Sequence, residues 1–170
     1  VAPGLFLEYA NSDVLMPLND YIKPEVLEDF SESSIDGVSV DDEILAIPFE
    51  MELFGLYYDK VALEEASVEV PKTWDDLYEA AKALTTDSSY GFMETVKGTH
   101  QLFEWYPFLW QTGNDVYNED KTAAALNNEG VLKNLEIKRK MFEEGYANIK
   151  PSRGNTEIGM LCEGETAMQI

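Results

Sequence analysis

Two carboxylates separated by a single residue, Glu50 and Glu52, mark the stretch of this sequence best suited to hold a polar molecule. The stretch, residues 47–60, reads Ile-Pro-Phe-Glu-Met-Glu-Leu-Phe-Gly-Leu-Tyr-Tyr-Asp-Lys and joins a shorter and a longer part of the chain, so we name it the crossing segment. In an extended chain, side chains two positions apart point to the same side, so both carboxylates would face one surface. A crossing between two bodies lined with polar groups is a candidate ligand cleft.

A second concentration of candidate groups lies at residues 99–111, where five aromatic side chains fall within thirteen positions. The spacing predicts a helix kinked at Pro107. If its amino end faces a cleft, the free N–H groups of the first turn and the amide of Gln101 are available to a polar ligand. Most of its aromatic residues fit one apolar helix face, but Phe103 and Trp105 remain candidates for stacking surfaces.

The first apolar run, residues 3–9, is predicted to form a buried strand that ends in Glu8 and Tyr9. Sheet proteins often place ligand groups at such a strand end. An ordinary exit from strand to loop explains the same pattern equally well.

Other local patterns predict a mixture of helices and strands. A hairpin is expected at residues 38–47, turning at Asp41 and Asp42. The clearest helix start is a capping box in which Thr73 pairs with Asp76, followed by Trp74 as a core residue. Further helices are expected near residues 24–30, 61–66, 127–144 and 157–163, and strands at 90–93 and 166–170. On the helix at 127–144 the predicted apolar face is Val131, Leu132, Leu135, Met141 and Phe142, with Lys138 as a polar exception.

Composition excludes several classes of function. A net charge of -21 repels phosphate backbones and argues against nucleic acid as a partner. Cys162 is the one cysteine and His100 the one histidine, so no disulfide, metal cluster or Ser-His-Asp triad is expected, and no cofactor is implied. Cys162 follows Met160 and Leu161 and is predicted to be a buried thiol. The sequence contains no apolar run long enough for a membrane span.

Five stretches resemble the carbohydrate-binding members of extracellular solute-binding protein family 1, the maltose-binding-protein-like receptors of ABC importers. They are Leu-Met-Pro-Leu-Asn-Asp-Tyr-Ile at 15–22, the crossing segment, Pro-Lys-Thr-Trp-Asp-Asp-Leu at 71–77, Phe-Leu-Trp-Gln-Thr-Gly at 108–113, and Glu-Gly-Glu-Thr-Ala-Met-Gln-Ile at 163–170. Each is moderately specific, and the resemblance rests on their order and spacing along nearly the whole chain.

The resemblance implies a two-lobed, periplasmic-binding-protein-like α/β fold of type II that closes on a sugar. Residues 1–58 would be a partial amino-terminal lobe and residues 59–170 a truncated carboxy-terminal lobe. Glu52 and Glu50 match the positions that bond sugar hydroxyls, and Phe103 and Gln101 match contacts on a helix of the second lobe. Glu8 and Tyr9 fall close to a ligand-touching strand end of the first lobe. Carboxylates accept paired hydroxyl groups, and aromatic faces cover the C–H faces of a pyranose.

The chain departs from the family pattern in length. Family members are about twice as long or more, the first strand and helix are missing here, and Gly4 stands where an Asp is usual. The sequence also stops before the family's Gly-Pro-Trp stretch and opens Val-Ala-Pro without an initiator Met. We therefore expect a fragment that binds sugar weakly, or not at all, by itself.

Three functions follow for testing. The first is a non-enzymatic receptor that captures a mono- or oligosaccharide outside the cell, as a lipoprotein or in the periplasm, and delivers it to the permease subunits of an ABC importer. The second is a receptor of the same architecture for a polyamine or a peptide. The third is a glycoside hydrolase that pairs Glu50 or Glu52 with Glu104. Such an enzyme needs its two carboxyl groups at a defined separation across the scissile bond.

Overall fold

The computed structural model describes residues 3–51, 53–94, 100–149 and 159–170. The chain divides into two compact units, Val1–Leu53 and Phe54–Ile170, which we name unit 1 and unit 2. The division falls before Phe54, whereas the sequence analysis placed the lobe boundary after Tyr58. Residues 57–58 lie in unit 2 because they form a strand of its sheet.

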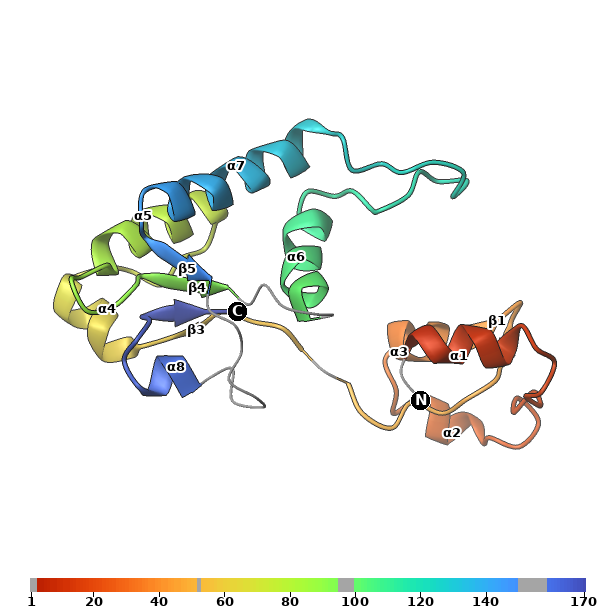
Figure 1. The fold of residues 1–170 in the computed structure, drawn as a ribbon. Coiled ribbons are helices and arrows are strands. Elements are labelled where there is room, and N and C mark those ends of the chain that lie inside the picture. Colours follow the sequence, from red (N-terminus) through yellow and green to blue (C-terminus); the bar gives the residue numbers. More distant parts are fainter. Residues whose placement is uncertain (1–2, 52, 95–99, 150–158) are drawn as a thin grey trace. The chain divides into compact units, whose positions relative to one another are not determined.

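Unit 1 is built from short local elements (Figure 1). Its elements are the helices α1 (Pro3–Ala10), α2 (Pro24–Leu27) and α3 (Glu32–Asp36) and the strands β1 (Ser39–Val40) and β2 (Glu43–Ile44). The predicted strand at residues 3–9 is wrong, because these residues form α1. A short apolar run fits either structure by periodicity alone, and Pro3 suits a first helical turn. Phe6 is buried on α1, while Glu8 and Tyr9 are exposed.

The predicted hairpin of unit 1 is confirmed. Strands β1 and β2 pair antiparallel, and Asp41 and Asp42 form the turn with φ values of 50° and 67°. Two successive positive φ values give the turn the twist that joins such strands, and Asp tolerates this conformation better than most residues. The Asn19 side chain fixes the hairpin from outside, since its amide donates to the Asp42 carbonyl at 3.0 Å and its oxygen accepts from the Ile44 N–H at 2.9 Å.

Unit 2 is an α/β layer structure around a sheet with the strand order β3-β6-β4-β5. Its strands are β3 (Tyr57–Tyr58), β4 (Phe92–Glu94), β5 (Ala147–Ile149) and β6 (Met168–Gln169). Its helices are α4 (Lys60–Ala66), α5 (Trp74–Leu84), α6 (His100–Trp110), α7 (Glu129–Glu143) and α8 (Gly159–Cys162). Strand β4 runs parallel to β5 and β6, and β3 is antiparallel to β6.

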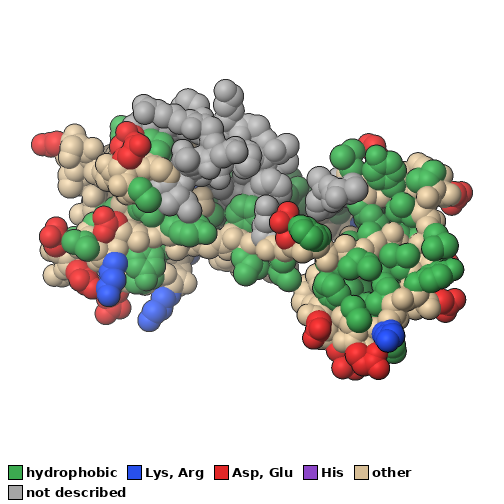
Figure 2. Space-filling view, turned by 90° about the horizontal axis from the view of Figure 1, so that it is seen from below, with side chains coloured by type: hydrophobic (Ala, Val, Ile, Leu, Met, Phe, Trp, Pro, Cys, Tyr) green, Lys and Arg blue, Asp and Glu red, His purple; other side chains and the backbone are tan. Residues whose placement is uncertain are grey.

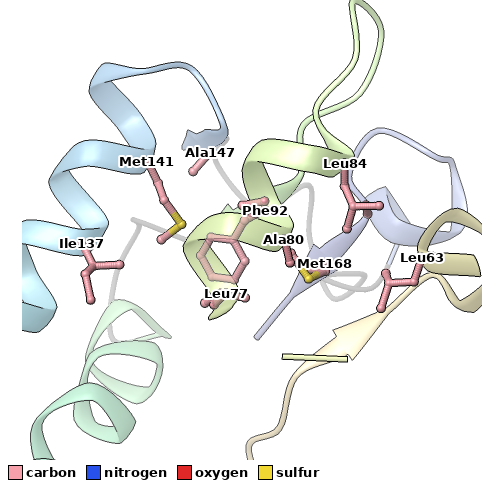
Figure 3. Close-up of a cluster of buried hydrophobic side chains, with 11 residues drawn as sticks. Leu63, Leu77, Ala80, Leu84, Phe92, Ile137, Met141, Ala147 and Met168 are labelled. Carbon is pink, nitrogen blue, oxygen red and sulfur yellow. The ribbon is translucent and has the colours of Figure 1, made fainter. Parts of the chain in front are cut away.

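The core of unit 2 lies between the sheet and helices α4, α5 and α7 (Figure 3). Phe92 of β4 and Met168 of β6 are fully buried against Leu77 of α5 and Met141 of α7. Gly91 makes close packing of β4 against α5 possible, because a Cβ atom there would lie 1.9 Å from the Ala81 carbonyl oxygen.

Helix α5 begins as predicted. The Thr73 side chain accepts from the Asp76 N–H at 3.1 Å, and the Asp76 carboxylate accepts from the Thr73 N–H at 3.0 Å. These two bonds satisfy donors that the helix start would otherwise leave free.

Helix α7 exists as predicted, but its buried face differs from the predicted one. Leu132 and Leu135 are exposed, whereas Asn134 and Ile137 are buried. The buried face is Val131, Asn134, Ile137, Lys138 and Met141. Cys162 is exposed, so the predicted buried thiol is also wrong; α8 is one turn long, and its buried residue is Met160.

Candidate functional site

The carboxyl ends of three parallel strands, β4, β5 and β6, meet at one edge of the unit 2 sheet. Open α/β sheets bind ligands outside this edge, because the loops and helix starts that follow the strands converge there. Strand β4 ends at Glu94, and the next element in sequence is α6, which carries three of the predicted site residues. We name this region the carboxyl edge.

On α6, the structure describes one of the three predicted ligand side chains. Trp105 is half-buried, and its ring centroid lies 5.9 Å from that of Tyr106. Gln101 and Phe103 occupy helical positions of α6, and their side chains lie outside the described residues. Pro107 lies inside the helix as predicted.

The remaining predicted residues belong to unit 1. Glu50 is exposed in a segment without regular structure, and Glu52 lies outside the described residues. Glu8 and Tyr9 are exposed on α1 rather than at a strand end, so the structural reason for choosing them no longer holds. The described residues of the predicted set therefore divide between Trp105 in unit 2 and the others in unit 1.

Two polar side chains of α7 contact helix α6, although the buried face of α7 is otherwise apolar. The Asn134 amide donates to the Phe108 carbonyl at 2.9 Å, which satisfies one of the last carbonyl groups of the helix. Lys138, one turn further along α7, places its ammonium 3.9 Å from the centroid of the Phe108 ring. The same ammonium forms an ion pair with Glu94, the last residue of β4.

This ion pair is buried, with side-chain exposures of 8% for Lys138 and 7% for Glu94. A buried charge is costly unless it is paired, so the two groups depend on each other. An ammonium over an aromatic ring gains further electrostatic stabilisation from the ring's negative face. The arrangement joins β4, α6 and α7 at the carboxyl edge.

Beside α6 the surface of unit 2 is hollowed by about 200 Å³. The hollow is lined by residues 54–56 of the crossing segment, by Pro71–Trp74 at the start of α5, and by Pro107 and Ile170, among others. Trp74 stacks on Phe108 with ring centroids 3.6 Å apart and an angle of 19° between the planes. Trp74, predicted to be a core residue, thus packs on α6 and also borders this hollow.

Two buried polar atoms, the Trp74 indole nitrogen and the Gln169 amide oxygen, have no hydrogen-bond partner in the described structure. Neither was singled out from the sequence. Among the described residues there is no group of three or more His, Cys, Asp or Glu side chains that could hold a metal ion. Across the same residues, no helix is long and apolar enough to cross a membrane.

The sequence analysis missed the connection through Lys138. It noted Lys138 only as a polar exception on the apolar face of this helix. That exception was the available signal, because Asn134 and Lys138 are four positions apart and therefore share a helix face. The partner, Glu94, could not be paired with it from sequence alone, since forty-odd residues separate them.

The profile of the bacterial extracellular solute-binding protein family matches residues 1–170. The arabinooligosaccharide-binding protein of Halalkalibacterium halodurans is 26% identical over 136 residues, which cover 79% of this chain and 29% of the relative. The maltodextrin-binding protein MdxE of Bacillus subtilis is 31% identical over 132 residues, covering 72% of this chain and 30% of the relative.

Solved structures agree on the fold. The sugar-binding protein MalE from Xanthomonas citri superposes with a TM-score of 0.81 at 20% identity, over 98% of this chain and 44% of that one. The GacH receptor of Streptomyces glaucescens, solved unliganded and with acarbose, gives a TM-score of 0.80 at 20% identity, over 98% and 43%. The fold is therefore that of the two-lobed type II binding proteins, of which this chain represents a part.

The chain spans about a third of the length of the curated relatives it matches. The predicted family resemblance is confirmed over the whole chain. The chain belongs to the bacterial extracellular solute-binding protein family.

Proposed function

We propose that the full-length protein containing this chain is a carbohydrate receptor that delivers a mono- or oligosaccharide to the membrane subunits of an ABC importer. Its relatives are named for arabino-, galacto- and maltodextrin-type oligosaccharides, which supports this class of ligand. The proposed activity is binding without chemistry. The proposed location is outside the cytoplasmic membrane, in the periplasm or as a surface lipoprotein.

The observation that carries the proposal within the structure is the position of α6. The helix follows the carboxyl end of β4, where α/β sheets bind ligands, and it carries Gln101, Phe103 and Trp105. The half-buried Trp105 ring combines a fixed apolar surface with partial exposure. Such a surface suits the C–H face of a sugar ring, while an amide and carboxylates suit its hydroxyl groups.

The proposal includes unit 1 as part of a first lobe. Glu50 and Glu52 of the crossing segment would accept hydrogen bonds from sugar hydroxyls, and Glu8 and Tyr9 remain weaker candidates. Closure of the two lobes would be the functional motion, because a ligand that contacts both lobes favours the closed form. The lobes proposed for this motion are residues 1–58 and 59–170, each completed by further chain.

A receptor for a cationic solute such as a polyamine is the competing proposal. The net charge of -21 favours it, because an acidic cleft attracts cations. Hydrolysis by Glu50 or Glu52 with Glu104 is disfavoured, since the named relatives are binding proteins.

A thermal-shift and calorimetric panel on the full-length protein tests the proposal. Maltotriose, arabinotriose, a galactooligosaccharide and spermidine would be compared at equal concentrations. We expect at least one oligosaccharide to raise the melting temperature, since ligand that binds the folded state stabilises it. A rise with spermidine alone would overturn the sugar assignment, and release of reducing sugar would revive the hydrolase.

Matched variants on one helix locate the site. Trp105→Ala should weaken binding of the active sugar by roughly tenfold, in line with the loss of one stacking ring. Trp110→Ala is the control, because Trp110 is exposed at the carboxyl end of α6 and is not among the proposed ligand residues. Equal losses for both variants would argue against a site at the amino end of α6.

A further inference from the structure

We propose that Lys138 is a positioning residue for the ligand site, which it holds in place through Glu94 and Phe108 without touching the ligand. The proposal has two parts. That Lys138 supports ligand binding rests on the proposed function. That Lys138 fixes α6 relative to β4 can be tested without any ligand. The argument begins with the two groups that Lys138 contacts.

Glu94 and Phe108 lie on either side of the ligand-bearing segment. Glu94 ends β4, and Phe108 lies in the last turns of α6, so the start of α6 with Gln101 and Trp105 comes between them in sequence. Lys138 pairs with Glu94 and lies over the Phe108 ring. Lys138 of α7 therefore contacts the residue before this segment and a residue after it.

A second α7 residue acts on the same point. Asn134 bonds the Phe108 carbonyl at 2.9 Å and is itself buried, with 7% of its surface exposed. Asn134 and Lys138 thus form a polar ridge, one helical turn long, in the otherwise apolar buried face of α7. The Asn134 hydrogen bond is directional and ties α6 to one place along α7, and the Lys138 ion pair ties α7 to the end of β4.

The far side of Phe108 is also covered. Trp74 stacks on this ring at 3.6 Å, so Phe108 is held by α5 as well as by α7. A buried ion pair is weak support for stability, because apolar residues of similar volume often replace it without loss. Its better attested use is to specify one arrangement among several, which is the role assigned here to Lys138.

The test compares variants of the full-length protein by amide hydrogen exchange and by calorimetric titration with maltotriose. In the double variant Lys138→Met/Glu94→Leu both members of this ion pair become apolar, so neither is left as an unpaired buried charge. We expect its melting temperature to stay close to that of the wild type. Exchange in α6 should become about tenfold faster, while α5 amides remain unchanged, because the loss is local.

Glu94→Gln is the second variant. It removes one charge but keeps an oxygen that can accept from the Lys138 ammonium, so the fold is retained and an intermediate increase in α6 exchange is expected. The matched control is Lys133→Met/Asp75→Leu, which removes an exposed ion pair of 2.6 Å between α7 and α5. It should leave α6 exchange and maltotriose binding unchanged, because exposed pairs contribute little.

Two readouts separate this inference from the sugar assignment. If the wild type binds maltotriose, the double variant should bind it roughly tenfold more weakly despite its retained stability, as small displacements of binding groups cost affinity. If maltotriose binds neither the wild type nor the variants, maltotriose is not the ligand of this protein. The proposal about Lys138 is then tested by the rate of amide exchange in α6 alone. The proposal would be overturned if α6 amides exchanged at the wild-type rate in both Lys138→Met/Glu94→Leu and Glu94→Gln. It would also be overturned if the affinity for maltotriose fell only in proportion to the loss of melting temperature.

Discussion

Unit 1 and unit 2 differ in how many apolar side chains they bury. Among its described residues, unit 2 has a cluster of eleven buried side chains from three helices, three strands and position 167 just before β6, which are distant from one another in sequence. Among the described residues of unit 1, the buried hydrophobic side chains are Phe6 and Ile44. Phe49 is 97% exposed in this unit, and Tyr21 is 70% exposed. Hydrophobic side chains are visible over much of the unit's face in the space-filling view (Figure 2).

The difference shows which interactions specify each unit. Burial of apolar surface stabilises unit 2, since about 25 cal/mol is gained for each Å² removed from water. Unit 1 relies on local devices such as the Asn19 bonds to its hairpin and the Ser31 cap of α3. Local bonds define conformation but contribute roughly 1 kcal/mol each. For the 170-residue chain by itself, we therefore expect unit 1 to unfold at lower denaturant concentration than unit 2.

The largest expected effect comes from emptying the unit 2 core. Phe92→Ala removes a ring with no exposed surface and should lower the free energy of unfolding by about 4 kcal/mol, because a cavity remains. Phe6→Ala in unit 1 should cost less than half as much. Urea unfolding followed by tryptophan fluorescence reports unit 2, because Trp74, Trp105 and Trp110 all belong to it, and amide exchange of α1 at the same urea concentrations reports unit 1. Equal losses would contradict the contrast between the units.

A smaller but still large effect is expected from breaking the buried ion pair on one side. Lys138→Ala leaves Glu94 buried without its partner and should destabilise unit 2 by about 3 kcal/mol. Lys133→Ala, which breaks the exposed pair with Asp75, should cost under about 1 kcal/mol. The two lysines lie on the same helix, so similar values in the same urea titration would show that burial of the pair is unimportant.

The hairpin of unit 1 offers a local test. Asn19→Ala removes the two bonds that hold the turn and should cost about 1 kcal/mol, seen as faster exchange of the Ile44 amide. The urea transition of unit 2 should not move. A shift of that transition would mean that the two units unfold together, contrary to the comparison above.

The smallest effect concerns the capping box of α5 and depends on pH. The hydrogen bond with the Thr73 side chain, followed by the Lys72 backbone N–H, lowers the pKa of Asp76 below its ordinary value of 3.8. Because the folded pKa is depressed, Asp76 stabilises the fold above its ordinary pKa, and this contribution is lost as pH falls through the folded value. In an NMR titration of Thr73→Ala, the Asp76 pKa should rise toward 3.8. An unchanged value would mean that the cap does not act through Thr73.

Sequence predicted well where local chemistry decides the structure. The Thr73 capping box, the Asp41-Asp42 turn and the start of the helix at Pro24 depend on a few adjacent residues, and all three are confirmed. Residues 3–9 were predicted to form a strand but form helix α1, because a single apolar run without clear periodicity fits both structures.

Sequence failed where contacts between distant segments decide. The buried face of α7 includes Asn134 and Lys138, whose burial depends on Glu94 and Phe108 from other elements. A polar residue can face a core only if its partner is there, and spacing along one helix does not reveal the partner. The ligand residues proposed from the family resemblance stay predictions, with Trp105 as the one on α6 whose surroundings the structure describes.

The most direct test of the whole account is amide exchange on the full-length protein with and without the sugar that binds best in the panel. The account predicts new protection at the crossing segment and at the amino-terminal turns of α6, with little change on the outer helices α5 and α7. Protection confined to α5 and α7, or to unit 1 alone, would contradict a ligand site at the carboxyl edge.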